Sequence, residues 1–162
     1  MSFNKYLPHV LVLPEDDANL RLANEFHLQI NQLRQMQLLP VAEGWVNVLD
    51  LFENVHVREM ERDPLRFMIL LIDFDGAGNR LQLAKARIPQ ALMDRVFVLG
   101  AWSEPEKLRA AEGSYKDIGF GMAEDCRRGT NETWGKPLLQ HNAGELARLR
   151  QHVVPTILFP PP

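Results

Sequence analysis

The sequence predicts an α/β protein, a three-layer sandwich in which helices flank a mostly parallel sheet of four or five strands. Two observations support this class: short apolar runs of strand length alternate with amphipathic stretches of helix length, and several stretches have capping residues or helix breakers at their ends. Such alternation is typical of parallel sheets, because consecutive parallel strands need a crossover connection. A chain of 162 residues has room for one core. We expect a single domain over 1–162, with a core over about 8–112 and a helical extension over about 113–162.

In the first half of the chain, three apolar runs are predicted to be strands, and two amphipathic stretches are predicted to be helices. The run HVLVL is uninterrupted, as in a buried strand, and Asp16 or Asp17 behind it is a favoured helix cap. Leu20, Ala23 and Ile30 then recur at helical spacing. The run RFMILLIDFD is the strongest strand candidate. The predicted order is a strand over 9–13, a helix over 17–33, a strand over 36–42, a helix over 44–62 and a strand over 66–75.

The second half begins with the same alternation and then becomes less regular. Ser103 is the predicted cap of a short helix, and Asn142 is the predicted cap of the C-terminal helix. The segment KDIGFGMAEDC is expected to add an edge element to the sheet. The predicted order is a helix over 78–92, a strand over 94–100, a helix over 104–113, the edge element over 116–126 and a helix over 135–153.

The composition is that of an ordinary globular protein and argues against several classes of function. Hydrophobic residues make up 46% of the chain and charged residues 24%. A net charge of −3 gives no broad basic field, which argues against a free-standing, high-affinity DNA-binding module. The single cysteine, Cys126, excludes an intrachain disulfide and a cysteine-based zinc cluster. The N-terminus does not resemble a signal peptide, and no apolar run is long enough to cross a membrane. We therefore expect a cytoplasmic protein without a membrane partner.

Carboxylates follow two of the predicted strands. Glu15, Asp16 and Asp17 follow the first strand, and Asp73 and Asp75 close the third. Ligands gather at the carboxyl ends of strands in open parallel sheets, and alternation along an extended chain places Asp73 and Asp75 on one side. Converging carboxylates repel one another, and a hard divalent cation removes this cost. An oxygen-rich, cysteine-free set indicates Mg²⁺ or Mn²⁺.

Simpler roles exist for some of these carboxylates. Asp16 or Asp17 serves as a helix cap, and Asp75 followed by Gly76 is typical turn chemistry. Glu15 has neither role, because glutamate is favoured neither as a cap nor in a turn. The combination of Glu15 with the Asp pair is therefore the informative pattern.

A glutamate that closes the first strand and an Asp-x-Asp that closes the third resemble the Toprim fold, the catalytic domain shared by topoisomerases, bacterial primases and overcoming-lysogenization-defect nucleases. The resemblance covers roughly 10–109, with Glu15 as the glutamate and Asp73 and Asp75 as the pair. The family usually has glycine directly after the glutamate, where this chain has Asp16. No tyrosine lies in a recognisable topoisomerase motif, and the zinc module typical of primases is absent. The resemblance therefore points to the small, nuclease-like members of the family.

That resemblance implies a metal-dependent phosphodiester hydrolase that acts on nucleic acid, with DNA expected ahead of RNA and with an ATPase as a potential partner protein. Glu15, Asp73 and Asp75 would be the catalytic residues and would hold one or two Mg²⁺ or Mn²⁺ ions, with Asp17 as a further metal ligand. The metal would polarise the phosphodiester and activate water for in-line attack.

Other residues offer contacts to a substrate. Arg80 and Lys85, on the predicted helix after the Asp pair, are candidates to bind phosphate, and an exposed helix face is the alternative explanation for both. Trp45, Trp102 and Trp134 have rings able to stack on bases, although packing is the simpler role for them.

A second resemblance is to the receiver domains of response regulators. In that family two acidic residues after the first strand bind Mg²⁺, as VLVLPEDDANLRLA suggests here, and VFVLGAWSEPEKLRAAEG resembles the fourth strand and helix. Asp73 would then accept a phosphoryl group, and Ser103 would supply the family's hydroxyl. The Lys-Pro that ends a receiver's fifth strand has no good match, because Lys136-Pro137 follows TNETWG. A third alternative is a degenerate acidic site in an α/β adaptor that binds another protein.

Overall fold

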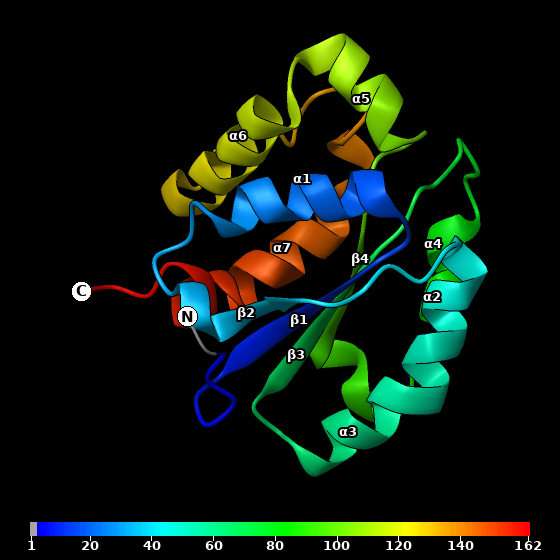
Figure 1. Cartoon of the computed structure of the whole chain (residues 1–162), viewed down its shortest axis with the longest axis vertical. Coiled ribbons are helices and arrows are strands. Elements are labelled where there is room, and N and C mark those ends of the chain that lie inside the picture. Colours follow the sequence, from blue (N-terminus) through cyan, green and yellow to red (C-terminus); the bar gives the residue numbers. More distant parts are fainter. Residues whose placement is uncertain (1–2) are drawn as a thin grey trace.

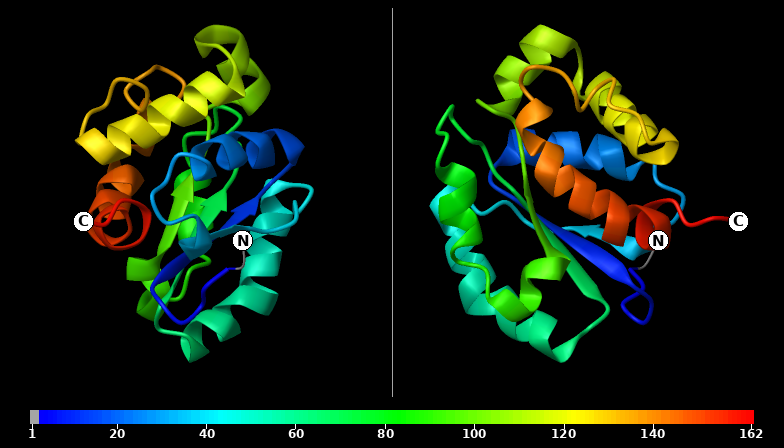
Figure 2. Two further views of the ribbon diagram at one scale, coloured as in Figure 1. Left: turned by 60° about the vertical axis from the view of Figure 1, so that its left-hand side comes forward. Right: turned by 180° about the vertical axis from the view of Figure 1, so that it is seen from behind.

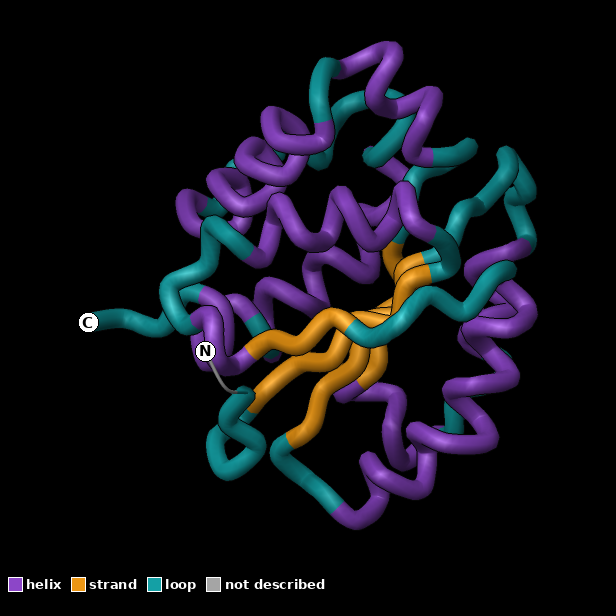
Figure 3. Tube along the Cα trace, viewed as in Figure 1, coloured by secondary structure: helices purple, strands orange, loops and turns teal. Residues whose placement is uncertain are grey.

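A computed structural model, which describes residues 3–162, contains one four-stranded sheet in the order β2-β1-β3-β4, with every neighbouring pair parallel (Figures 1 and 3). In the central register, Val12 lies beside Leu38 on one side and Ile69 on the other. The predicted α/β class with a parallel sheet is confirmed. The strands are β1 (His9–Pro14), β2 (Met36–Leu38), β3 (Arg66–Leu71) and β4 (Val96–Leu99).

Helices cover both faces of the sheet and give the molecule its three layers (Figure 2). One face is covered by α1, α6 and α7, and the other by α2, α3 and α4. Short 3₁₀ or π-helical turns join several of them. The helices are α1 (Asp17–His27), α2 (Trp45–Leu51), α3 (Val57–Arg62), α4 (Arg80–Lys85), α5 (Pro105–Glu112), α6 (Tyr115–Arg128) and α7 (Ala143–His152). The turns are η1 (Leu33–Gln35), η2 (Phe52–His56), η3 (Gln90–Arg95), η4 (Gln140–Asn142) and η5 (Val154–Leu158).

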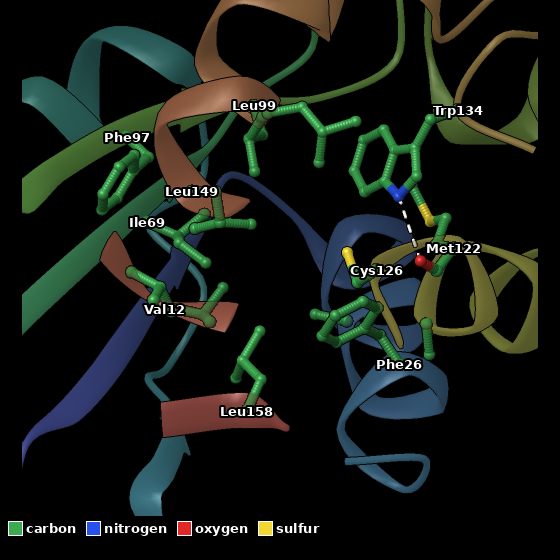
Figure 4. Packing of buried hydrophobic residues seen from close by; sticks show 14 of the residues in the cluster. Val12, Phe26, Ile69, Phe97, Leu99, Met122, Cys126, Trp134, Leu149 and Leu158 are labelled. Atoms are coloured by element: carbon green, nitrogen blue, oxygen red, sulfur yellow. Dashed lines mark hydrogen bonds between the residues drawn. The ribbon is translucent and has the colours of Figure 1, made fainter. Parts of the chain in front are cut away.

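The two faces of the sheet have separate hydrophobic cores, which explains the uninterrupted apolar strands. Val10 and Val12 pack under α1, α6 and α7, whereas Leu11 and Leu13 pack under α2, α3 and α4. The first core contains a small apolar cavity of about 60 Å³, bordered by Val12 and by Trp134 among others (Figure 4). None of the helices formed by residues 3–162 has the length and apolarity needed to cross a bilayer.

Two predicted helices have the expected positions but a different internal form. The helix predicted over 44–62 is a continuous run of α2, the π-helical turn η2 and α3. The helix predicted within 78–92, with Pro89 as its end, is a short α4, and η3 follows Pro89, whose extended backbone with ψ of 141° cannot continue the helix. Because β3 already ends at Leu71, the segment between β3 and α4 is longer than predicted, and it contains the Asp pair.

The expected edge element over 116–126 is wrong, because these residues lie within α6. Helical spacing brings Ile118, Met122 and Cys126 into the core. The two glycines of this segment mark close contacts rather than an extended chain. A Cβ atom at Gly119 would lie 2.7 Å from the Cβ atom of Glu25, so α6 approaches α1 more closely than a larger residue would allow.

One predicted cap is wrong, and a second lies at the predicted position without a capping hydrogen bond. The N-cap position of α5 is Glu104 rather than Ser103, and its side chain makes no capping hydrogen bond. Asn142 does occupy the N-cap position of α7, but its side chain bonds to Gly100 after β4 instead of to the first turn of its own helix.

Polar side chains of α7 and of Asn142 just before it hydrogen-bond to main-chain groups along the outer edge of β4. A fifth strand would otherwise be needed there, because an edge strand presents unpaired N–H and C=O groups. Glu145 is 3% exposed and Asn142 is 2% exposed, so these bonds are shielded from water. The bonds run from Arg148 Nη1 to the Val96 carbonyl at 3.2 Å, from the Val98 N–H to Glu145 Oε1 at 3.0 Å, and in both directions between Asn142 and Gly100 at 3.1 and 2.9 Å.

Candidate functional site

The candidate site lies at the carboxyl ends of β1 and β3, where the order of the sheet reverses. The chain passes from β1 to β2 on one side and then to β3 on the other side. Such a switch point is where open α/β sheets bind ligands. Glu15 directly follows β1, and Asp73 lies two residues beyond β3. The structure therefore brings together the two strand ends that the sequence marked with carboxylates.

Glu15 connects the two strand ends. Its Oε2 atom accepts a hydrogen bond of 2.6 Å from the main-chain N–H of Asp73, and its side chain is largely buried. Its own carbonyl accepts bonds from the N–H groups of Glu43 and Gly44. Burial raises the pKa of Glu15, the Asp73 N–H opposes that rise, and the carboxylates of Asp16 and Asp75 add to it. Glu15 is thus held in place while its negative charge is disfavoured.

Asp73 has the most strongly altered pKa among the carboxylates of the site. It is 7% exposed, and its Oδ1 atom accepts a 3.0 Å bond from Asn19 Nδ2. Burial raises the pKa of Asp73 to about 7; the Asn19 bond opposes this, and the nearby charge of Glu15 adds to it. At neutral pH the cluster therefore needs a proton or a cation to offset its charge.

The structure separates the roles of Asp16 and Asp17. Asp16 is the N-cap of α1, and its Oδ1 atom accepts bonds from both the main chain and the side chain of Asn19 at 3.0 and 3.1 Å. Asp17 lies in the first turn of α1 and is exposed. Asn19 therefore joins the cap to the buried Asp73, a role that the sequence analysis did not assign to it.

Asp75 has a different environment from Asp73, although alternation predicted one side for both. Its backbone is left-handed, with φ of 48°, and its side chain is 53% exposed. Arg80 donates to Asp75 Oδ2 at 2.6 Å and to the Asp73 carbonyl at 2.8 Å. The guanidinium of Arg80 also lies 4.3 Å from the centre of the Trp45 ring. Arg80 is thus a cation at the edge of the acidic cluster.

Lys85, the other predicted phosphate ligand, has a different partner. Its ammonium group lies 3.0 Å from Glu145 Oε2 on α7, where it helps to neutralise the buried carboxylate at the edge of β4. The structure therefore brings Arg80 to the carboxylates of the site and gives Lys85 a role in packing.

Within residues 3–162, no group of three or more His, Cys, Asp or Glu side chains has the arrangement of a metal centre. The predicted set of Glu15, Asp17, Asp73 and Asp75 is therefore not assembled as four ligands. Its donor chemistry still fits Mg²⁺, which commonly binds one or two protein carboxylates and completes its shell with water and substrate phosphate. Glu15 and Asp73 are the two largely buried carboxylates at these strand ends.

Backbone geometry supports the site in two places. Glu43, like Asp75, has a left-handed backbone, with φ of 65°, and its N–H binds the Glu15 carbonyl at 2.8 Å. Strained residues of this kind cluster at functional sites. A Cβ atom at Gly100 would lie 1.6 Å from the Ile72 carbonyl, so glycine is needed where β4 passes the strand end that leads to Asp73. Nothing in the local sequence around Glu43 indicates its position beside Glu15.

Comparison with known proteins assigns no family. No protein-family model, no curated protein and no solved structure matches the chain.

Proposed function

We propose that this protein is a Toprim-like phosphodiester hydrolase of the nuclease class, dependent on Mg²⁺ or Mn²⁺, with its site at the ends of β1 and β3. One observation carries the proposal: Glu15 and Asp73 are both largely buried at the switch point of the sheet, where the Glu15 carboxylate accepts a hydrogen bond from the main-chain N–H of Asp73. Two buried carboxylates are costly unless positive charge accompanies them. A divalent cation supplies that charge and brings the phosphate of a substrate with it.

Each residue of the site has a distinct role in this proposal. Glu15 and Asp73 hold the cation, and Asn19 fixes the orientation of Asp73. A bound cation would polarise the phosphodiester and lower the pKa of a coordinated water. Arg80 offers guanidinium donors to a phosphate oxygen, because its side chain is anchored on Trp45 while its tip lies beside Asp75. Asp75 is exposed and becomes available to the cation when Arg80 turns to the phosphate.

The substrate in this proposal is nucleic acid, with DNA ahead of RNA, and an ATPase is the partner expected from the resemblance. The net charge of −3 supports a site that meets phosphate through its cation rather than through a broad basic surface. Because the pKa of Asp73 is about 7, a cation that binds at neutral pH displaces a proton from this carboxyl group. The affinity of the site for the cation should therefore increase as pH rises through about 7.

The test is cleavage of plasmid DNA and of a single-stranded oligonucleotide with Mg²⁺ or Mn²⁺. We expect activity from the wild type, none from Glu15→Gln or Asp73→Asn, and full activity from Asp94→Asn, an exposed carboxylate on η3. Equal activity in all four proteins, or none in the wild type with either metal, would remove the nuclease proposal.

A second candidate is a receiver-like phosphoacceptor, and the topology favours it specifically. The order β2-β1-β3-β4 matches the first four positions of the 2-1-3-4-5 sheets to which receivers belong. Asp73 follows β3, and the buried Ser103 hydroxyl has no hydrogen-bond partner within residues 3–162. The Ser103 carbonyl accepts a 3.1 Å bond from the Asp75 N–H, so Ser103 lies beside the segment that carries Asp73. Acetyl phosphate with Mg²⁺ should then add one labile phosphoryl group to the wild type and none to Asp73→Asn. An unchanged wild-type mass would exclude this candidate.

The adaptor alternative differs from both in its response to metal. Titration with Mn²⁺ to millimolar concentration, followed by calorimetry, should show binding to the wild type and weaker binding to Glu15→Gln. A wild type that binds no Mn²⁺ would leave the acidic site without a cation and favour the adaptor.

A further inference from the structure

A second concave site lies beside the acidic cluster, on the loop after β4. It is an open cavity of about 400 Å³ lined by Trp102, Pro137, Gln140 and His141. This volume lies within the range of small-molecule sites. The lining combines one large aromatic ring, an imidazole and an amide, which is the chemistry that binds a flat, polar-edged ligand.

His141 is a half-buried imidazole in the lining of this cavity. Both ring nitrogens are buried, and neither has a hydrogen-bond partner among the described residues. The ring packs against Phe74 at 4.8 Å and against Trp102 at 5.2 Å between centroids. Burial lowers the pKa of His141, and the nearby Gly100 carbonyl opposes this in part, so the imidazole is neutral at neutral pH. A neutral imidazole offers one donor and one acceptor, and buried polar groups of this kind are rarely left unpaired.

The ring of Trp102 packs against the ring of Phe74. The rings of Phe74 and Trp102 are stacked at 6.5 Å with an interplanar angle of 17°. Phe74 lies between the two aspartates of the acidic site in the sequence. The orientation of the Trp102 ring is thus coupled to the strand end that carries Asp73 and Asp75.

Main-chain hydrogen bonds place the cavity directly beside that strand end. The Gly76 N–H donates to the Trp102 carbonyl at 2.7 Å, and the Asp75 N–H donates to the Ser103 carbonyl at 3.1 Å. On its other side, the Trp102 N–H donates to the Leu138 carbonyl at 2.8 Å. The segment 102–103 therefore bonds to the loop that carries Asp75, while its Trp102 lines the cavity.

We propose that this cavity binds a nucleobase, that of a nucleotide whose phosphate occupies the acidic site. The base stacks on Trp102 and its polar edge bonds to Gln140, and a rotation of the half-buried His141 ring brings one of its nitrogens to the same edge. A planar ligand with donors and acceptors on its rim matches these three side chains, whereas a bare sugar phosphate has no face to stack. This inference rests on the proposed function for the phosphate end of the nucleotide, but the stacking site is measurable without catalysis.

The test is isothermal titration calorimetry in EDTA, with adenosine 5′-monophosphate as the probe and ribose 5-phosphate as the base-free control. We expect the wild type to bind the nucleotide and not the sugar phosphate. His141→Phe keeps a flat ring but loses the hydrogen bonds, and should weaken binding by about tenfold. Trp102→Leu should weaken it by about ten- to a hundredfold. Gln140 and Gln82 are both exposed, so Gln140→Ala should weaken binding while Gln82→Ala, on α4, should not.

The outcomes separate this inference from the proposed nuclease activity. Loss of binding in His141→Phe and Gln140→Ala, together with no metal-dependent cleavage in the wild type, would support the base site and remove the nuclease. Cleavage by the wild type, together with equal nucleotide affinity in all variants, would retain the nuclease and overturn the base site. Equal affinity for the nucleotide and the sugar phosphate, or no nucleotide binding at millimolar concentration, would also overturn it.

Discussion

The raised pKa of Asp73 predicts that this carboxylate costs the protein stability at neutral and alkaline pH. The pKa is about 7 in the folded protein and 3.8 in the unfolded chain. Because the folded state holds the proton more tightly, the contribution of Asp73 to stability is greatest below pH 3.8, falls between about pH 3.8 and 7, and is constant above. Replacement by asparagine, Asp73→Asn, removes the titration while keeping an oxygen that accepts the bond from Asn19.

The size of the effect follows from the two pKa values. A difference of about three pKa units corresponds to about 4 kcal/mol at 1.4 kcal/mol per unit. Asp73 is 7% exposed, so solvent screening reduces this figure little. We therefore expect Asp73→Asn to be about as stable as the wild type at pH 4, and more stable by a few kcal/mol at pH 8.

The measurement is urea unfolding of both proteins at pH 4, 6 and 8, in EDTA to remove metal. Asp94→Asn, which changes an exposed carboxylate, is the matched control and should show no pH-dependent difference. A stability difference between Asp73→Asn and the wild type that does not vary between pH 4 and pH 8 would refute the reasoning. Addition of Mg²⁺ at pH 8 should then stabilise the wild type and leave Asp73→Asn unchanged, because only the wild type has both carboxylates.

Three further predictions concern packing and buried polar groups. Asn142→Ala should cost about 2–4 kcal/mol in urea unfolding, because two buried main-chain groups of Gly100 lose their partner. Asp125→Asn should lower the free energy of unfolding by about 2 kcal/mol at pH 7 and by less as pH falls below 3.8. The reason is that hydrogen bonds from residues 130–134 outweigh the effect of burial and lower the pKa of Asp125. Urea unfolding curves at pH 7 and pH 3 would show this difference. Val12→Ile should fill part of the apolar cavity and raise the thermal midpoint through a gain of about 0.8 kcal/mol, whereas Val10→Ile, outside the cavity lining, should lower it.

The strands β1 and β4 were predictable because both of their faces are buried, which makes them uninterrupted apolar runs. The acidic strand ends were predictable for a related reason, since parallel strands bring their carboxyl ends to one edge of the sheet. The position of Asp75 was not predictable by alternation. Side chains alternate between the two faces of the sheet only as far as Leu71, where β3 ends. The left-handed backbone of Asp75 then directs its carboxylate toward Arg80.

Other features depended on contacts between segments that are distant in the sequence. The segment KDIGFGMAEDC was expected to be an edge element, but it is helical, and its Gly119 allows the close approach of α1, which local sequence does not reveal. Asn142 has the residue type of a cap, and its bonds to Gly100 follow from the open edge of β4 rather than from its own helix. Asn19 and Glu43 contact the site through the tertiary fold alone.

The polar start of α7 also limits how copies of this protein can associate. Since its side chains occupy the outer hydrogen-bonding groups of β4, a neighbouring molecule cannot add a strand there. The remaining sheet edge is β2, which is three residues long. A filament that grows head to tail by strand pairing needs two different open sheet edges on each copy of the protein. With only β2 open, strand pairing between copies can join β2 to β2, and the assembly stops at two molecules. The fold is thereby protected from forming open-ended filaments from its native sheet.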